Sequence, residues 1–191
     1  MKNLVIITAP SGSGKTTLCK EIQKKENGIQ FSISHTSRKI RQNEMNGVDY
    51  YFVTKDEFLD GINNNDFIEW NFHFDCYYGT SRSQIQQSID NKTPLLLELD
   101  VNGALAIQNL FPNQTISIFV EPPSINELKI RLQKRGSDTD EIITKRLQRI
   151  DFELSHKSNF DFSLINDKLS DATNKILEII KNETKGVSYV T

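Results

Sequence analysis

Residues 4–17 read LVIITAPSGSGKTT, and this stretch decides the fold. Leu4–Ile7 are an uninterrupted apolar run rich in β-branched residues, which is typical of a strand buried on both faces of a parallel sheet. A glycine-rich turn follows the run, and Lys15–Lys25 then show the pattern of a helix that ends at Asn27-Gly28. A strand, a tight turn and a helix in this order are the context of the phosphate-binding loop GxxxxGK[ST]. Here Ala9 stands in place of the first glycine of that pattern.

The chemistry of this loop predicts a bound nucleoside triphosphate. Gly12 and Gly14 let backbone N–H groups converge on phosphate oxygens, and the start of the helix adds partial positive charge. The Lys15 ammonium can reach the β- and γ-phosphates, and the Thr16 hydroxyl can ligate Mg²⁺. A chance glycine-rich turn is the competing interpretation, and the match of strand, turn and helix disfavours it. The residues assigned to the triphosphate are Ser11, Gly12, Ser13, Gly14, Lys15, Thr16 and Thr17.

The rest of the chain alternates between short apolar runs and helical patterns. This alternation predicts an α/β fold, with a parallel sheet flanked by helices. Capping boxes at Thr54 and Ser124 mark the starts of two helices. The further strands expected are Phe31–Ser34, Leu95–Leu99, Ile116–Val120 and Phe162–Ile165, and the last helix expected is Ala172–Asn182.

Two segments do not fit the alternating pattern and are expected to be lobes inserted into the sheet domain. Residues 34–83 are polar and aromatic, and residues 124–150 are locally basic. The core would then consist of residues 1–33, 84–123 and 151–191.

Composition excludes several classes of protein. The 191 residues carry a net charge of −2, whereas a dedicated nucleic-acid-binding protein usually has a basic excess. Two cysteines cannot form a disulfide framework. The longest apolar run is far shorter than the roughly 20 residues of a membrane-spanning helix. We therefore expect a cytoplasmic protein with small-molecule partners.

A second anion site is predicted after the second strand, because ligands bind beyond the carboxyl ends of parallel strands. Arg38 and Arg41 are three residues apart, and the guanidinium fork suits a phosphate group. Tyr50 and Tyr78 could add hydroxyl donors. A solvated charged surface is the alternative, and it is less favoured for two arginines beside a strand end.

Glu69 is a carboxylate among apolar neighbours, and a buried carboxylate needs hydrogen-bond donors. Guanine offers its N1–H and its 2-amino group side by side, whereas adenine has an acceptor at N1. The Ser34 and Thr80 hydroxyls could serve the purine O6. The alternative is a surface acid beside a partly buried Trp70, which is itself expected in the core, and spacing alone does not decide between the two.

Two acids stand at the end of the third expected strand. Glu98 and Asp100 point to the same face of that strand, a position that often holds a metal-linked carboxylate in phosphate-loop proteins. The alternative is that one of them caps the segment that follows.

Together these motifs resemble those of the guanylate kinase family, whose members pass a phosphate from ATP to GMP. The matching strings are ITAPSGSGKTTL, SHTSRKIRQNE, GVDYYFV, FIEW, YYGTS, LELDVNGA, FVEPPS, RLQKRG, KRL and LIND, in family order over about residues 4–180. The resemblance implies a phosphate-loop kinase core, a GMP-binding lobe at 34–83 and a small helical lid at 124–150. It implies ATP and GMP, and also dGMP, as substrates, Mg²⁺ as cofactor, and no nucleic-acid or membrane partner.

The resemblance also implies roles for individual residues. Ser34, Glu69, Thr80 and Asp100 would hold guanine, and Arg38, Arg41, Tyr50 and Tyr78 would hold the GMP phosphate, with Glu44 orienting an arginine. Catalysis would rest on Lys15, Arg38 and the lid arginines Arg131, Arg135 and Arg146, and Asn166 would contact adenine. Both inserted lobes are expected to close on the substrates and exclude water.

Two other functions remain as alternatives. A non-catalytic guanylate-kinase-like domain would bind phosphopeptides, but such domains usually lose the loop or the arginines kept here at Lys15, Thr16, Arg131 and Arg135. A related sugar-phosphate kinase should lack the guanine-reading residues. The sequence also departs from the family, with Glu98 in place of the usual Asp and Asp75-Cys76 in place of Gly-Asn.

Overall fold

The computed structural model describes residues 2–73, 75–134 and 140–184, and for 132, 134, 140–143, 145 and 146 it describes only the backbone. Its elements, in chain order, are β1 (Leu4–Thr8), α1 (Lys15–Lys25), β2 (Gln30–Phe31), β3 (His35–Thr36), β4 (Tyr51–Phe52), α2 (Lys55–Asn63), β5 (Phe67–His73), β6 (Cys76–Ser81), α3 (Arg82–Asn91), β7 (Leu95–Leu99), α4 (Val101–Leu110), β8 (Thr115–Glu121), α5 (Ile125–Lys134), α6 (Asp140–Ser155), the 3₁₀ turn η1 (Lys157–Asn159), β9 (Phe162–Ile165) and α7 (Leu169–Glu183).

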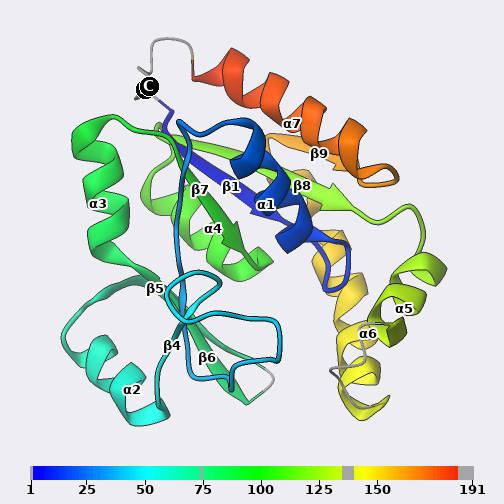
Figure 1. Ribbon diagram of the computed structural model, residues 1–191, viewed down its shortest axis with the longest axis horizontal. Coiled ribbons are helices and arrows are strands. Elements are labelled where there is room, and N and C mark those ends of the chain that lie inside the picture. The colour runs from blue at the N-terminus through cyan, green and yellow to red at the C-terminus, as the bar shows by residue number, and fades with distance from the viewer. Residues whose placement is uncertain (1, 74, 135–139, 185–191) are drawn as a thin grey trace.

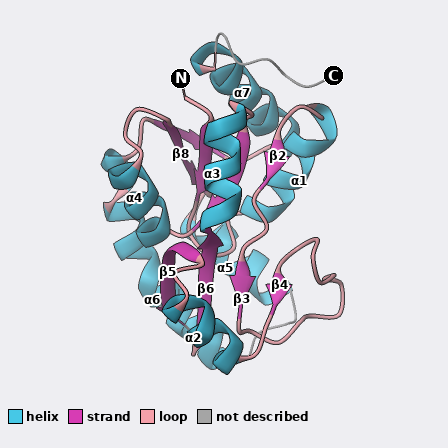
Figure 2. Ribbon diagram, turned by 90° about the vertical axis from the view of Figure 1, so that its left-hand side faces the viewer, coloured by secondary structure: helices cyan, strands magenta, loops and turns pink. Residues whose placement is uncertain are grey.

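Five parallel strands form the larger sheet in the order β2-β7-β1-β8-β9. Side chains of β1 alternate between its faces, so that Val5 and Ile7 pack with α1 and α7, whereas Leu4 and Ile6 pack with α3 and α4. Figure 2 shows α1 and α4 on opposite sides of this sheet. Helices on both faces bury every residue of β1, which explains its continuous apolar run. The predicted α/β fold is confirmed.

A smaller sheet is inserted between β2 and α3. Its strands run in the order β4-β3-β6-β5, and α2 packs on it. The capping box at Thr54 is complete, since Thr54 Oγ1 accepts from the Glu57 amide and the Glu57 carboxylate accepts from the Thr54 amide. Phe58 of α2 is fully buried and stacks on Phe67, with ring centroids 4.4 Å apart. In Figure 1 this sheet and the α5–α6 pair flank the same end of the larger sheet.

Two predictions from the sequence are wrong: the strand at Phe31–Ser34 and the core position of Trp70. The second strand of the larger sheet is only Gln30–Phe31, and by Ser34 the chain has joined the smaller sheet, where the Ser34 carbonyl accepts from the Tyr51 amide at 2.9 Å. Trp70 is not in the core, because its side chain is 45% exposed. Trp70 lies on β5, the edge strand of the smaller sheet, and its ring contacts Tyr77 of β6 with ring centroids 6.0 Å apart.

The turn between β5 and β6 has the backbone geometry that glycine favours. Asp75 has a φ of 60°, in the left-handed region, where most residues other than glycine are strained. Aspartate is one of the few residues besides glycine that enter this region, so the departure from the family at Asp75 is compatible with the turn. Among the residues that the structure describes, no helix has both the length and the apolar character of a membrane span.

Candidate active site

The phosphate-binding loop lies between β1 and α1 and depends on two glycines. Gly12 and Gly14 have φ values of 91° and 86°, which side chains other than glycine rarely permit. A Cβ on Gly14 would also lie 2.9 Å from the Asn166 amide nitrogen. That nitrogen donates to the Ser13 carbonyl at 2.9 Å, so Asn166 holds the loop from behind. Asn166 is 5% exposed and does not line the cavity described below, and its contact with adenine stays a prediction.

Lys15 and Thr16 both reach the end of the neighbouring strand β7. The Lys15 ammonium donates to the Leu99 carbonyl at 2.6 Å, and the Thr16 hydroxyl donates to the Glu98 carboxylate at 2.6 Å. Parallel pairing of β1 with β7 sets Ile7 opposite Glu98 and therefore brings the acid to the loop. The Lys15 ammonium, which can bind phosphate, therefore lies next to the hydrogen-bonded pair of Thr16 and Glu98.

The Thr16–Glu98 pair suits Mg²⁺. In the described part of the chain no three His, Cys, Asp or Glu side chains gather into a metal site. Mg²⁺ in kinases is typically held by one or two protein oxygens together with substrate phosphates and water. A hydroxyl and a carboxylate 2.6 Å apart beside a phosphate loop fit that pattern.

The predicted anion clamp is assembled by Glu44. Its carboxylate accepts two hydrogen bonds from the Arg38 guanidinium, at 2.8 and 3.0 Å, and one from the Arg41 amide at 2.9 Å. Burial alone would raise the pKa of Glu44, but these bonds and charges lower it overall, so it stays ionised. The Arg38 guanidinium also lies 5.5 Å from the Tyr50 ring centroid. Tyr78 lies beside Tyr50, with ring centroids 6.2 Å apart.

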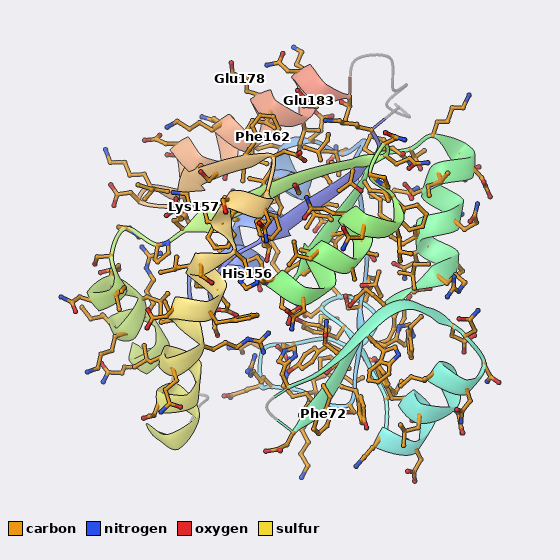
Figure 3. The ribbon with its side chains drawn as sticks, turned by 180° about the vertical axis from the view of Figure 1, so that it is seen from behind. Phe72, His156, Lys157, Phe162, Glu178 and Glu183 are labelled. Carbon is orange, nitrogen blue, oxygen red and sulfur yellow. The ribbon has the colours of Figure 1, made fainter. Side chains whose placement is uncertain are left out.

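The position of Glu69 depends on an irregularity in β5. Phe67 pairs with Ser81 but Glu69 pairs with Thr80, so the strand carries a bulge at Ile68. A bulge re-aims the side chains that follow it. Phe67 packs against Phe58, whereas Glu69, Asn71 and His73 line the cavity. Phe72, between the last two, is half exposed at the outer part of the smaller sheet (Figure 3).

Two carboxylates face each other at the base of the cavity. Glu69 accepts from the Thr80 hydroxyl at 2.5 Å, and Asp100 caps α4 by accepting from the Gly103 amide at 2.8 Å. A Cβ on Gly103 would lie 2.8 Å from Glu69 Oε2, so a glycine there makes room for the acid. Burial and, to a smaller extent, the charge of Asp100 raise the pKa of Glu69 to about 7, although the hydrogen bonds from Thr80 lower it.

Sequence reasoning missed two residues of α6 that enter the site. Arg149 donates to Asp100 at 2.8 Å and lies 3.5 Å from Glu153, and Glu153 accepts from the Ser11 amide at 3.2 Å. Burial raises the pKa of Glu153, and the nearby Lys15 opposes that shift. These contacts connect α6 to both the phosphate loop and the carboxylate pair. The i,i+4 spacing of Arg149 and Glu153 is the only feature of the sequence that pairs them. It does not identify a site, because surface ion pairs on helices have the same spacing.

The lid arginines are described only in part. Arg131 lines the cavity, and its guanidinium donates to Glu127 one helical turn away at 3.0 Å. Arg135 lies outside the described residues. Arg146 belongs to α6, but its side chain also lies outside the described part of the chain.

One cavity of about 540 Å³ brings these groups together. The predicted site residues that line it are Ser11, Gly12, Gly14, Lys15, Thr16, Thr17, Ser34, Arg38, Arg41, Tyr50, Glu69, Tyr78, Asp100 and Arg131. Three predicted residues do not line it but bind residues that do: the Ser13 amide donates to the Pro10 carbonyl, Glu44 binds Arg38, and Thr80 binds Glu69. Asn71, His73, Arg149 and Glu153 line it without having been predicted.

Comparison with known proteins identifies the family of this chain. The guanylate kinase family model matches residues 1–183. A guanylate kinase of Chlorobium luteolum is 40% identical over 179 residues, which cover 94% of this chain and 91% of the relative. A guanylate kinase of Pseudomonas fluorescens is 42% identical over 178 residues, which cover 93% of this chain and 86% of that protein.

Comparison of the fold with solved structures finds a member of the same family. The crystal structure of guanylate kinase from Anaplasma phagocytophilum superposes with a TM-score of 0.80 at 28% identity, covering 96% of this chain and 86% of that one. Because the family model matches nearly the whole chain and the relatives exceed 30% identity over most of both lengths, the chain belongs to the guanylate kinase family.

Proposed function

We propose that the cavity holds ATP and GMP together and that the chain transfers the γ-phosphoryl group of ATP to the 5′-phosphate of GMP. The observation that supports this most is that one cavity contains both the phosphate loop and the carboxylate pair. A triphosphate on the loop and a purine on the carboxylates would face each other across Arg38 and Arg41. The two reacting groups are both anions, so positioning and neutralisation of charge carry most of the catalysis.

On the ATP side, the backbone of residues 11–17 would hold the phosphates. The Lys15 ammonium would exchange the Leu99 carbonyl for β- and γ-phosphate oxygens. Thr16 and Glu98 would hold Mg²⁺ with those phosphates, and the ion would supply charge neutralisation. Glu98 has one more methylene than the usual Asp, but its carboxylate already reaches the Thr16 hydroxyl.

On the GMP side, Arg38, Arg41, Tyr50 and Tyr78 would bind the 5′-phosphate. Glu44 contributes by holding the Arg38 fork in place before the substrate arrives. Burial raises the pKa values of the Tyr50 and Tyr78 hydroxyls, so both remain donors. Two guanidinium groups and two neutral hydroxyl donors together suit a phosphate dianion.

Guanine would be recognised by Glu69 and Asp100, with the Ser34 and Thr80 hydroxyls near O6. An ionised Glu69 accepts from N1–H and the 2-amino group, which adenine cannot offer together. A site built on such hydrogen bonds can reject the wrong base by roughly 10⁴-fold. The deoxyribose of dGMP leaves these contacts intact, so dGMP is expected to serve as well.

The lobe at 34–83 and the lid at 124–150 are proposed to close over both substrates. Arg131, Arg135 and Arg146 would then meet the transferring group, and water would be excluded from it. Small-angle scattering with GMP and a non-hydrolysable ATP analogue should give a smaller radius of gyration than the protein without ligands. Identical profiles would contradict closure.

The direct test is ADP release with ATP, Mg²⁺ and each of GMP, dGMP, AMP, CMP and UMP. Turnover with the two guanine nucleotides alone is the expected result. Folded protein that binds ATP but phosphorylates none of them would refute the proposal.

A further inference from the structure

The side chain of Asn71 contacts both carboxylates of the base pocket. Its amide nitrogen donates to Glu69 Oε2 at 3.3 Å and to Asp100 Oδ1 at 3.4 Å. Both distances are at the long end for hydrogen bonds, so these bonds are easily exchanged. Since both neighbours are carboxylates, the NH₂ side of the amide is the side that faces them.

This contact has the chemistry of a guanine 2-amino group. That group also carries two N–H donors, and in the proposed complex they would lie between the same two acids. The other carboxylate oxygens have donors of their own, Thr80 for Glu69 and Arg149 for Asp100, and Asp100 Oδ1 also accepts from the Gly103 amide. Asn71 therefore completes the hydrogen bonding of the pair while the pocket holds no base.

We propose that Asn71 lets the enzyme accept a 6-oxopurine monophosphate without a 2-amino group, namely IMP, as a second phosphoryl acceptor. This inference rests on the proposed function of the pocket. Without Asn71, such a base would leave Glu69 Oε2 without the amide donor, next to an Asp100 whose Oδ1 keeps the Gly103 amide, and this disfavours binding. With it, the side-chain amide keeps its two hydrogen bonds and the N1–H of hypoxanthine still reaches Glu69.

GMP remains compatible with the same side chain. The 2-amino group of GMP brings its own two N–H donors to Glu69 and Asp100, so it replaces the two long Asn71 bonds and the amide can turn away from the carboxylates. Asn71 would thus adapt to either base. The transfer itself is unchanged: a 5′-phosphate oxygen of IMP bonds to the γ-phosphorus, the bond to the β-phosphate oxygen breaks, and IDP and ADP result.

The test compares kcat/KM for GMP and IMP at pH 8 in the wild type, Asn71→Leu and Asn71→Ala. Leucine matches asparagine in size but has no donor, and alanine guards against a packing defect in the leucine variant. Asn174→Ala, at an exposed position on α7, is the matched control. We expect the preference for GMP over IMP to rise about tenfold or more in both Asn71 variants, through loss of IMP turnover, and to stay unchanged in the control.

The inference is overturned if the Asn71 variants phosphorylate GMP with an unchanged preference over IMP. It is also overturned if, for the wild type, the inhibition constant of IMP exceeds the dissociation constant of GMP by more than about 10⁴-fold. That ratio is the rejection expected of a pocket without the Asn71 donor. Wild-type protein that fails with GMP would instead refute the proposed function, so the two failures are distinguishable.

Discussion

The raised pKa of Glu69 makes recognition of GMP depend on pH. Only the ionised carboxylate can accept from N1–H and the 2-amino group, and burial raises its pKa to about 7 before GMP binds. The ionised fraction is then about ten-elevenths at pH 8, one half at pH 7 and one-eleventh at pH 6. We therefore expect kcat/KM for GMP to fall about tenfold from pH 8 to pH 6 because of this group.

The 5′-phosphate of GMP also titrates in this range, with a second pKa of about 6. The control must therefore be a variant whose pH profile reflects the phosphate but not residue 69. Glu69→Gln is such a variant, because its amide does not ionise. At pH 8 this variant should lose about 10²-fold in kcat/KM for GMP, the effect of replacing a charged acceptor. The decisive measurement is the ratio of wild type to variant in a coupled ADP-release assay between pH 6 and pH 8, with ATP and Mg²⁺ saturating.

The expected ratio falls about tenfold as the pH drops from 8 to 6. Parallel pH profiles for the two proteins would refute the assignment of Glu69 as the ionised carboxylate that binds guanine.

The pH dependence of folding stability provides an independent test of the same pKa. A carboxyl whose pKa is raised from 4.5 to about 7 binds more protons in the folded state, so the free energy of unfolding falls as pH rises through that window. The loss should approach about 3 kcal/mol by pH 8 in the wild type and be absent from Glu69→Gln.

Three further predictions concern the phosphate loop, the metal site and the smaller sheet. Lys15→Ala should nearly abolish turnover while calorimetry still detects GMP binding, and wild-type turnover would contradict its role. Glu98→Gln should raise the Mg²⁺ concentration for half-maximal rate about tenfold with KM for GMP little changed, since a charged ligand becomes neutral; an unchanged Mg²⁺ dependence would count against the site. Phe58→Ala should lower the free energy of unfolding by about 3–5 kcal/mol in urea titrations, because a fully buried ring that stacks on Phe67 is lost; a loss below about 1 kcal/mol would contradict that packing.

Local pattern was sufficient for the core of the fold. The run at Leu4–Ile7, the glycines at 12 and 14 and the helix that follows are specified by neighbours in sequence, and the structure has them where they were predicted. The capping box at Thr54 is equally local and marks the start of α2 correctly. Strand Leu95–Leu99 agrees residue for residue. In each case the signal is a periodicity or a cap that acts over a few residues.

The environment of Glu69 is a different kind of property. Its neighbours in sequence left a surface acid and a buried reader equally plausible. The bulge at Ile68, the missing side chain at Gly103 and the proximity of Asp100 decide that it is buried against another carboxylate. None of these is visible from spacing along β5, because they depend on how the smaller sheet meets α4.

The sequence by itself therefore determined the phosphate loop, the parallel sheet and, through the motifs, the family. Only the tertiary structure decided which side chains complete the pocket. Asn71 and Arg149 belong to β5 and α6, 78 positions apart in number, yet both donate to Asp100. Local elements follow from short-range backbone and capping preferences, whereas a binding pocket is made of contacts between segments that only folding brings together.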